Sequence, residues 1–266
     1  MEFVAAHDLD EALAVKAQQP DAQLLAGGTD LMVEVNLAHH RPSRILSLRR
    51  VEELREVTPT RIGAGVTWAR LERDRHRGLA QAARTVGSPQ IRAAGTIGGN
   101  VGTASPAGDG LPWIAAADAS IEVRSKERGT RTIPWNEFFT GVKRTSLAAD
   151  EIITAVVVPE DVSSAQEFAK VGARNAMVIS TVSCVVIRGD DGIRVALGSV
   201  ATTPMRATRA EEMINAESTI SESVLAEFAR IVSDEVRPIT DHRSTEAYRR
   251  HASGVLARRL VERSLL

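Results

Sequence analysis

Two glycine-containing segments of the sequence have the residue types that bind phosphate groups. The first reads Leu24-Leu25-Ala26-Gly27-Gly28-Thr29-Asp30-Leu31, in which an apolar run meets two glycines and a predicted helix start. Glycine permits positive φ and close approach of a ligand to the backbone, and free N–H groups at a helix start attract anions. The segment matches neither G-x-G-x-x-G nor a Walker loop. It indicates a diphosphate cradle, with an unliganded tight turn as the alternative.

The second segment, residues 95–110, contains six glycines. We expect it to form a long loop, because that glycine content excludes a regular helix or a long strand. Four of its polar side chains can form hydrogen bonds with hydroxyl or phosphate oxygens: Thr96, Asn100, Thr103 and Ser105. Asp109 could accept hydrogen bonds from sugar or ribityl hydroxyls. Two such segments in one domain suggest that both meet one polyanionic ligand.

The remaining reactive residues point away from hydrolysis and from metal chemistry. Cys184 is the single cysteine, so the chain can form no internal disulfide and cannot ligate an iron–sulfur cluster. No H-x-H or H-x-x-x-H pair occurs, and there is no G-x-S-x-G. We therefore expect no catalytic side chain and no metal site, and any chemistry must come from a bound cofactor. A cytoplasmic location is the default for such cysteine usage.

Composition excludes several classes of protein. The chain has 266 residues, 43% of them hydrophobic and 25% charged, which predicts a globular protein of roughly two domains. Thirty-three basic and 34 acidic residues give a net charge of −1, so nucleic-acid binding is not expected. Aromatic residues make up only 3%, which argues against a base-stacking platform. No apolar run is long enough to span a membrane, and the first residues lack a secretory signal.

Hydrophobic periodicity predicts alternating helices and strands up to Pro159. Asp8 and Glu11 suggest a capping box at the start of a helix over 8–19. Further helices are expected at 31–38, 79–86 and 114–117, and strands at 23–26, 45–48, 61–66, 121–124, 130–133 and 152–158. The strands at 121–124 and 130–133 flank a turn and predict a hairpin.

The pattern changes after residue 161, where we place a domain boundary that separates residues 1–161 from 162–266. Strands at 167–171, 181–188 and 193–200 predict an antiparallel meander. Helices are expected near 208–215, 221–235 and 244–264. In the last helix we expect Tyr248 to belong to the apolar face. We expect the arginines of this helix to lie on a solvated face or, alternatively, at an interface with another chain; they are Arg249, Arg250, Arg258 and Arg263.

The two glycine segments, in this order and at this separation, resemble the FAD-binding (medium) subunit of the molybdenum hydroxylases. The matching motifs are Ala26–Leu31, Thr96–Asn100 and Thr103–Pro106 with Asp109, supported by 150–153, 168–170 and 241–249. The family includes xanthine dehydrogenase and aerobic carbon monoxide dehydrogenase. The resemblance covers essentially the whole chain. It implies an α+β fold, with a PCMH/VAO-type FAD-binding domain of two α/β subdomains. A C-terminal domain of a three-stranded antiparallel sheet and three helices follows.

The resemblance also implies which residues hold FAD. The diphosphate would be wrapped by Leu24, Leu25, Ala26, Gly27, Gly28, Thr29, Asp30 and Leu31. The diphosphate and ribityl region would be held by Thr96, Ile97, Gly98, Gly99, Asn100 and Thr103. Asp109 would bind a cofactor hydroxyl, and Ile153 and Lys170 would contact the flavin end. A lysine there would stabilise reduced, anionic flavin, and a solvated strand lysine is the alternative reading of Lys170.

Partners and substrate follow from the same resemblance. The molybdopterin centre and the [2Fe-2S] clusters must reside on separate large and small subunits, which implies a heterohexamer built as a dimer of heterotrimers. FAD would be bound non-covalently, because neither segment contains histidine or cysteine. Val86 stands where eukaryotic xanthine dehydrogenases have an aromatic residue stacked on the flavin.

A xanthine-like substrate is the default. A carbon monoxide enzyme typically has Gly-Gly-His-Ser where this chain has Gly27-Gly28-Thr29-Asp30. NAD⁺, oxygen or a quinone would be the acceptor. The alternatives are a stand-alone flavin oxidoreductase, a medium subunit of the carbon monoxide dehydrogenase type and a non-catalytic assembly module.

Overall fold

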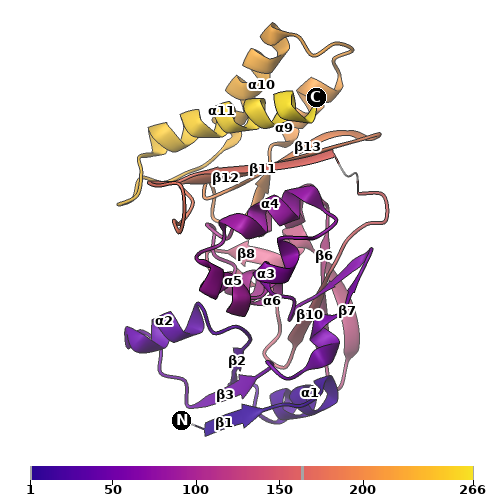
Figure 1. Cartoon of the computed structure of the whole chain (residues 1–266), viewed down its shortest axis with the longest axis vertical. Coiled ribbons are helices and arrows are strands. Elements are labelled where there is room, and N and C mark those ends of the chain that lie inside the picture. Colours follow the sequence, from indigo (N-terminus) through magenta and orange to yellow (C-terminus); the bar gives the residue numbers. More distant parts are fainter. Residues whose placement is uncertain (1, 163–164, 266) are drawn as a thin grey trace.

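The first subdomain is a small parallel sheet with one covering helix. The computed structural model describes residues 2–162 and 165–265. Strands β1 (Glu2–Ala5), β2 (Gln23–Leu25) and β3 (Arg44–Ser47) are parallel and lie in the order β1-β3-β2. Helix α1 (Leu9–Gln18) packs on this sheet and forms its core with β3, at the lower end of Figure 1. The predicted N-cap is confirmed, since Asp8 accepts from the Glu11 N–H at 2.7 Å.

The second subdomain is a five-stranded antiparallel sheet in the order β4-β5-β10-β6-β7. Its strands are β4 (Val57–Thr58), β5 (Arg61–Gly63), β10 (Ile152–Val157), β6 (Ser120–Ser125) and β7 (Gly129–Pro134). The expected β6–β7 hairpin is confirmed, and side chains on β6 alternate between buried and partly exposed. Strand β10 has a register irregularity between Ile153 and Ala155.

Short helices cover this sheet and connect the two subdomains. They are η1 (Glu52–Arg55), α2 (Leu31–Asn36), α3 (Trp68–Leu71), α4 (Arg77–Thr85), α5 (Pro89–Ala94), α6 (Ile97–Thr103), α7 (Leu111–Ala116) and α8 (Trp135–Phe138), with the small hairpin β8 (Phe139–Gly141) and β9 (Arg144–Thr145). The helices expected at 31–38, 79–86 and 114–117 are thus confirmed within a few residues. Helix α2 buries none of its residues, whereas every residue of α7 is buried.

The prediction that residues 95–110 contain no helix is wrong, because α6 lies within them. Thr96 caps α6 by accepting from the Gly99 N–H at 3.0 Å. A Cβ on Gly98 would lie 2.5 Å from the Cβ of Ala64, so only glycine permits this close packing. Each glycine disfavours a helix by about 1 kcal/mol. The cap and the packing against Ala64 outweigh that intrinsic preference.

The C-terminal domain is an antiparallel sheet with helices on one face. Strands β11 (Ala165–Val171), β12 (Val182–Gly189) and β13 (Gly192–Gly198) form the expected meander, and β14 (Met205–Arg206) adds a short fourth strand to the three that we predicted. Helices α9 (Thr208–Asn215), α10 (Glu222–Glu235) and α11 (Glu246–Ser264) pack on one side of the sheet. The opposite side faces α4 and α7 of the first domain (Figure 1).

The expected orientation of α11 is wrong at its first turn. Arg249 is buried and donates to the carbonyls of Thr181 and Ser199 at 2.7 and 2.9 Å, while Tyr248 is half-exposed. Arg249 lies three residues before Ala252 on the helix, so it belongs to the same buried face. That face ends over carbonyl groups of the sheet, which need donors rather than an apolar side chain.

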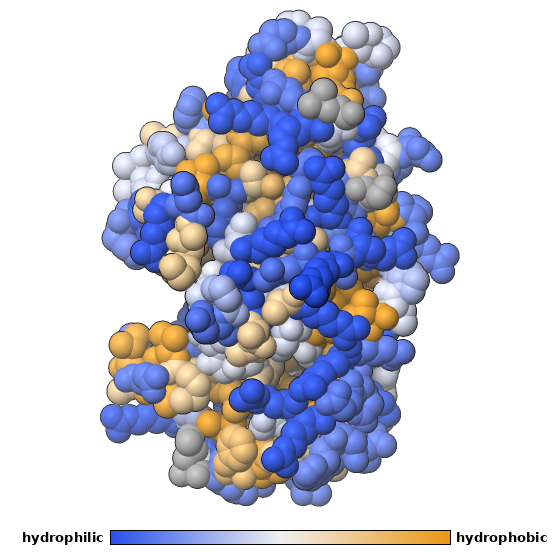
Figure 2. All heavy atoms as spheres, in the orientation of Figure 1, coloured by the Kyte–Doolittle hydropathy of each residue, from blue (hydrophilic) through white to orange (hydrophobic). Residues whose placement is uncertain are grey.

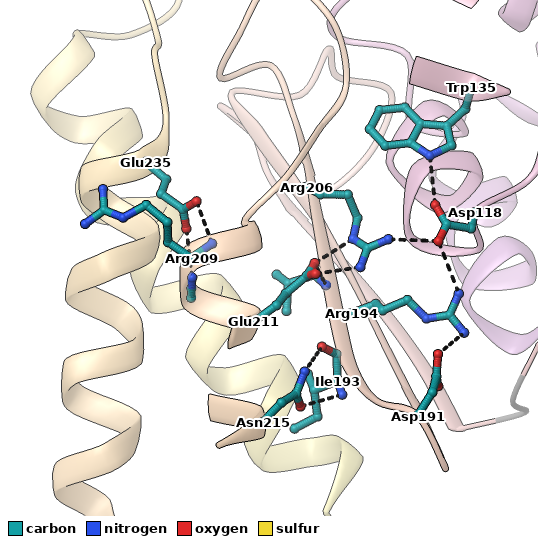
Figure 3. A network of polar contacts seen from close by, with 12 residues as sticks. Asp118, Trp135, Asp191, Ile193, Arg194, Arg206, Arg209, Glu211, Asn215 and Glu235 are labelled. Carbon is teal, nitrogen blue, oxygen red and sulfur yellow. Dashed lines mark hydrogen bonds and ion pairs between the residues drawn. The ribbon is translucent and has the colours of Figure 1, made fainter. Parts of the chain in front are cut away.

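A network of polar contacts joins the two domains (Figure 3). Asp118, which follows α7 with a φ of 51°, accepts a hydrogen bond from Trp135 at 3.0 Å and pairs with Arg206 at 3.3 Å. Arg206 also pairs with Glu211 at the start of α9. In the residues that the structure describes, no helix is both long and apolar enough to cross a membrane.

Candidate functional site

The two glycine segments lie against each other. A Cβ on Gly27 would be 2.1 Å from the carbonyl oxygen of Ala94, so the first segment touches the backbone that leads into α6. Thr103, at the end of α6, donates to Asp30 Oδ2 at 3.1 Å. The two segments therefore lie side by side, as binding of one ligand by both requires, although the second one contains a helix.

A cleft of about 1500 Å³ opens beside these segments. Figure 2 shows a hollow at the left edge of the molecule, above the apolar side chains that gather over α2. Most of the predicted site residues line the cleft; they are Leu24, Ala26, Gly27, Gly28, Thr29, Asp30, Leu31, Thr96, Gly98, Gly99, Asn100, Thr103 and Ile153. Leu25 and Ile97 do not line it, and the Ile97 side chain belongs to the core.

The first segment supplies the free backbone donors of the cleft. Within residues 2–162 and 165–265, the N–H groups of Gly28, Thr29 and Asp30 donate to no other residue. The first two N–H groups of α6 are already used, because those of Ile97 and Gly98 donate to carbonyls of the segment before α3 at 3.0 and 2.9 Å. The first segment therefore offers three free N–H groups in a row to an anion, whereas the first N–H groups of α6 are occupied.

The second segment instead offers open space and an unsatisfied acceptor. A Cβ on Gly99 would approach only the hydroxyl of Thr96, at 3.2 Å. The buried Oδ1 of Asn100 has no hydrogen-bond partner in the described part of the chain. A buried acceptor without a donor destabilises a protein unless a ligand supplies one. A dinucleotide with a diphosphate and a hydroxylated linker, such as FAD, fits this donor and acceptor set.

Asp109 and Lys170 were expected to contact the cofactor, but the structure pairs them with each other at 2.6 Å beneath the cleft. Burial raises the pKa of Asp109, while the ammonium of Lys170 and hydrogen bonds from Ser180 and Thr85 act in the opposite direction. Both side chains are about nine-tenths buried, and neither is among the residues that line the cleft. Their contact with a cofactor stays a prediction.

Sequence reasoning missed residues that reach the cleft from distant parts of the chain. Lys143, in the turn between β8 and β9, pairs with Glu34 of α2 at 2.7 Å across 109 positions. Their hydrogen bond lowers the pKa of Glu34 and raises the pKa of Lys143. Ile179 and Arg249 of the C-terminal domain also line the cleft. Arg249 belongs to the stretch 241–249 that supports the resemblance, whereas no local pattern marks Glu34, Lys143 or Ile179, because only the tertiary fold brings them here.

The reactive groups considered in the sequence lie elsewhere or are inert. Cys184 is fully buried in β12, and burial raises the pKa of its thiol. In the described ranges of the chain, no group of three or more His, Cys, Asp or Glu side chains is arranged to hold a metal ion.

Comparison with known proteins gives the same ligand. Residues 1–161 match the family model "FAD binding domain in molybdopterin dehydrogenase", and residues 167–264 match "CO dehydrogenase flavoprotein C-terminal domain". The chain is 33% identical to the nicotinate dehydrogenase FAD-subunit of Eubacterium barkeri, over 98% of this chain and 95% of that one. It is 32% identical to the xanthine dehydrogenase FAD-binding subunit of Escherichia coli O157:H7, over 97% and 93%.

Solved structures share the whole fold. Carbon monoxide dehydrogenase from Hydrogenophaga pseudoflava superposes with a TM-score of 0.90 at 28% identity, covering 100% of this chain and 97% of the matched chain. Quinoline 2-oxidoreductase from Pseudomonas putida 86 has the same fold, with a TM-score of 0.92 at 24% identity, covering 99% and 96%. The predicted fold class is confirmed. With its paired glycine segments, its cleft and these matches, the chain belongs to the family of FAD-binding subunits of the molybdenum hydroxylases.

Proposed function

We propose that this chain binds FAD in the cleft and serves as the electron exit of a molybdenum hydroxylase. The observation that carries the proposal is the junction of the two glycine segments, where free amide groups and a buried, unsatisfied acceptor belong to residues that line the same cleft. Bound FAD supplies the redox chemistry, taking electrons from [2Fe-2S] clusters on a partner and passing them to NAD⁺, oxygen or a quinone. The chain itself binds the cofactor and orients it.

The residues divide this work along the cleft. The N–H groups of Gly28, Thr29 and Asp30 hold the diphosphate, since they are free and lie at a helix start. Asn100 Oδ1 accepts from a ribityl hydroxyl. Ile153 gives an apolar contact to the flavin end. The other predicted residues that line the cleft form its walls around the cofactor; they are Leu24, Ala26, Gly27, Leu31, Thr96, Gly98, Gly99 and Thr103.

Partners and location follow from the relatives. The matched proteins are the FAD or medium subunits of larger enzymes, including nicotinate, xanthine and carbon monoxide dehydrogenases. We place the [2Fe-2S] clusters and the molybdopterin on separate small and large subunits, in a dimer of heterotrimers. The single, buried cysteine supports separate metal subunits and a cytoplasmic location. The boundary near residue 161 separates the FAD domain from the C-terminal domain.

The proposal is tested by purifying the complex through a tag on this chain. We expect one flavin on this chain, released by denaturation, with iron and molybdenum on two co-purifying chains. A chain that purifies alone, contains flavin and oxidises a small substrate without partners would favour a stand-alone oxidoreductase. A full-length chain that binds no FAD in titration would rule out both readings.

A further inference from the structure

The indole N–H of Trp68 differs from those of the other two tryptophans. Trp113 Nε1 donates to Gln166 Oε1 at 2.9 Å, and Trp135 Nε1 donates to Asp118 Oδ1 at 3.0 Å. In the described part of the chain, the Nε1 of Trp68 forms no hydrogen bond. A tryptophan N–H that folding removes from bulk water usually finds an acceptor, so the donor of Trp68 is available to a ligand.

The side chain of Trp68 is buried in the protein and still borders the cleft. Its exposed fraction is 2%, and Trp68 is one of the residues that line the cleft. Among the described residues, the polar side-chain atoms that are both fully enclosed and unpartnered do not include Trp68 Nε1, so this nitrogen keeps access to the cleft. The indole therefore offers the cleft a donor and cannot accept a hydrogen bond in return.

Backbone contacts fix the position of Trp68 beside the second glycine segment. Thr67 caps α3 by accepting from the Arg70 N–H at 3.4 Å, and the N–H of Trp68 donates to the carbonyl of Gly95 at 3.0 Å. Thr67 and Thr96 also form an isolated antiparallel bridge. The donor is thus positioned before any ligand binds, which lowers the entropy cost of forming a hydrogen bond to a ligand.

The edge of the indole that carries the nitrogen runs between two polar groups of the cleft. A Cβ on Gly95 would lie 3.3 Å from Trp68 Cδ1 and 3.1 Å from Thr29 Oγ1. A Cβ on Gly110 would lie 3.3 Å from Trp68 Cζ2 and 2.9 Å from Asn100 Oδ1. Nε1 lies between Cδ1 and Cζ2 along this edge of the ring. One end of the edge is therefore near Thr29, and the other end is near the unsatisfied acceptor of Asn100.

The groups at the Thr29 end of this edge are donors. The N–H groups of residues 28–30 are free, and the Thr29 hydroxyl makes no hydrogen bond in the described ranges. The charged oxygens of a diphosphate only accept hydrogen bonds, so they suit this end, whereas a sugar hydroxyl can donate to Asn100. The indole N–H lies where the donors end and the acceptor begins. In FAD, that boundary is the phosphate next to the ribityl chain.

We propose that Trp68 Nε1–H donates a hydrogen bond to the flavin-side phosphate of FAD. This rests on the proposed function and extends it, because a side chain of α3 then enters a diphosphate site otherwise built from the two glycine segments. A hydrogen bond to a charged oxygen in an enclosed site is stronger than one between neutral groups. Trp68 therefore favours ligands with a diphosphate over ligands with a single phosphate.

The first experiment is Trp68→Phe, which removes the donor and keeps an aromatic ring in its place. We expect the Kd values of the flavin-free full chain for FAD and for ADP to rise by the same factor, about 10- to 150-fold, since one hydrogen bond to a charged group is lost. AMP lacks the flavin-side phosphate and should bind both chains alike. Trp135→Phe is the control, because its N–H is paired with Asp118 and it does not line the cleft, and it should change none of these affinities.

Each other outcome of the titrations contradicts a different statement. Unchanged FAD and ADP affinities in a folded Trp68→Phe chain would overturn the inference. A loss for FAD alone would assign the donor to the ribityl chain, and an equal loss for AMP would assign it to the adenosine-side phosphate, so either result would also overturn it. Failure of the unaltered chain to bind FAD or ADP would instead overturn the proposed function.

The second experiment uses the unaltered chain and does not depend on the folding of a variant. NMR of the ¹⁵N-labelled full chain follows the indole N–H signals of Trp68, Trp113 and Trp135. With saturating ADP, the Trp68 proton should move downfield and exchange more slowly with water, whereas the other two are already paired inside the protein and should not change. A Trp68 proton whose exchange rate stays the same in saturating ADP would refute the hydrogen bond to phosphate.

Discussion

Replacing Gly27 by alanine tests whether contact between the two glycine segments creates the FAD site. The new Cβ would lie 2.1 Å from the carbonyl oxygen of Ala94 and 2.8 Å from the Cα of Gly95. Ordinary contacts begin at 3.4 Å, so the two backbones must move apart by about 1 Å. Neither neighbour is a flexible side chain, and the segments therefore cannot relax without separating.

The expected effect follows from the diphosphate contacts. A displacement of this size breaks one or two hydrogen bonds from backbone amides to a charged phosphate, each worth about 1.5–3 kcal/mol. The Kd for FAD should therefore rise at least about tenfold, for one bond of about 1.5 kcal/mol, and up to about 20,000-fold, for two bonds of about 3 kcal/mol each. Fluorescence titration of FAD into the flavin-free chain measures it, and circular dichroism checks the fold.

Gly141→Ala is the matched control, because a Cβ there would meet only the side chain of Arg144 at 3.8 Å. It should bind FAD like the unaltered chain. A folded Gly27→Ala variant whose Kd stays within twofold of the unaltered value would refute the reasoning, since the site would then not depend on this contact.

Three further outcomes are expected. Gly28→Ala and Gly129→Ala place alanine at φ values of 75° and 71°. Thermal unfolding should therefore show that both variants lose a similar amount of stability, about 1–2 kcal/mol in the free energy of unfolding. Only Gly28→Ala should also weaken FAD binding in titration. Thr103→Val removes the hydrogen bond from Thr103 to Asp30. The Kd for FAD should rise by up to about tenfold, and hydrogen exchange of the backbone amides in α2 should accelerate. Unchanged amide exchange in α2 would show that this hydrogen bond does not hold the helix. Burial opposes ionisation of Asp241, but hydrogen bonds from two backbone amides and from Arg249 lower its pKa to about 2 from 3.8. The ionised form is thus favoured by folding above pH 3.8, and this stabilisation disappears as the pH falls toward 2. In urea unfolding the deficit of Asp241→Asn should shrink over that range, and a constant deficit would contradict the assignment.

Much of the fold was predictable because local signals agreed with tertiary packing. The Asp8 cap, the β6–β7 hairpin and the strands of the meander all have periodicity and turn residues that match their final environment. The convergence of the glycine segments was also predictable, since two backbones with so few side chains suit a close approach to one ligand.

The errors arose where long-range contacts decided the structure. Helix α6 forms despite its glycines because Gly98 packs on Ala64, a contact that is invisible in a local window. Arg249 is buried because the carbonyl groups of Thr181, just before β12, and Ser199, just after β13, accept hydrogen bonds from it. Lys170 and Asp109 have the residue types expected beside a flavin, and only the fold reveals that they bind each other.

Two polar contacts hold the α2 region, residues 30–40, over the cleft: Asp30 to Thr103 and Glu34 to Lys143. Because α2 buries none of its residues, this region can move away from the cleft once those two contacts break, while the hydrophobic cores stay intact. FAD can then enter or leave through a local opening of the folded protein, and raised ionic strength should speed its exchange by weakening the exposed Glu34–Lys143 pair.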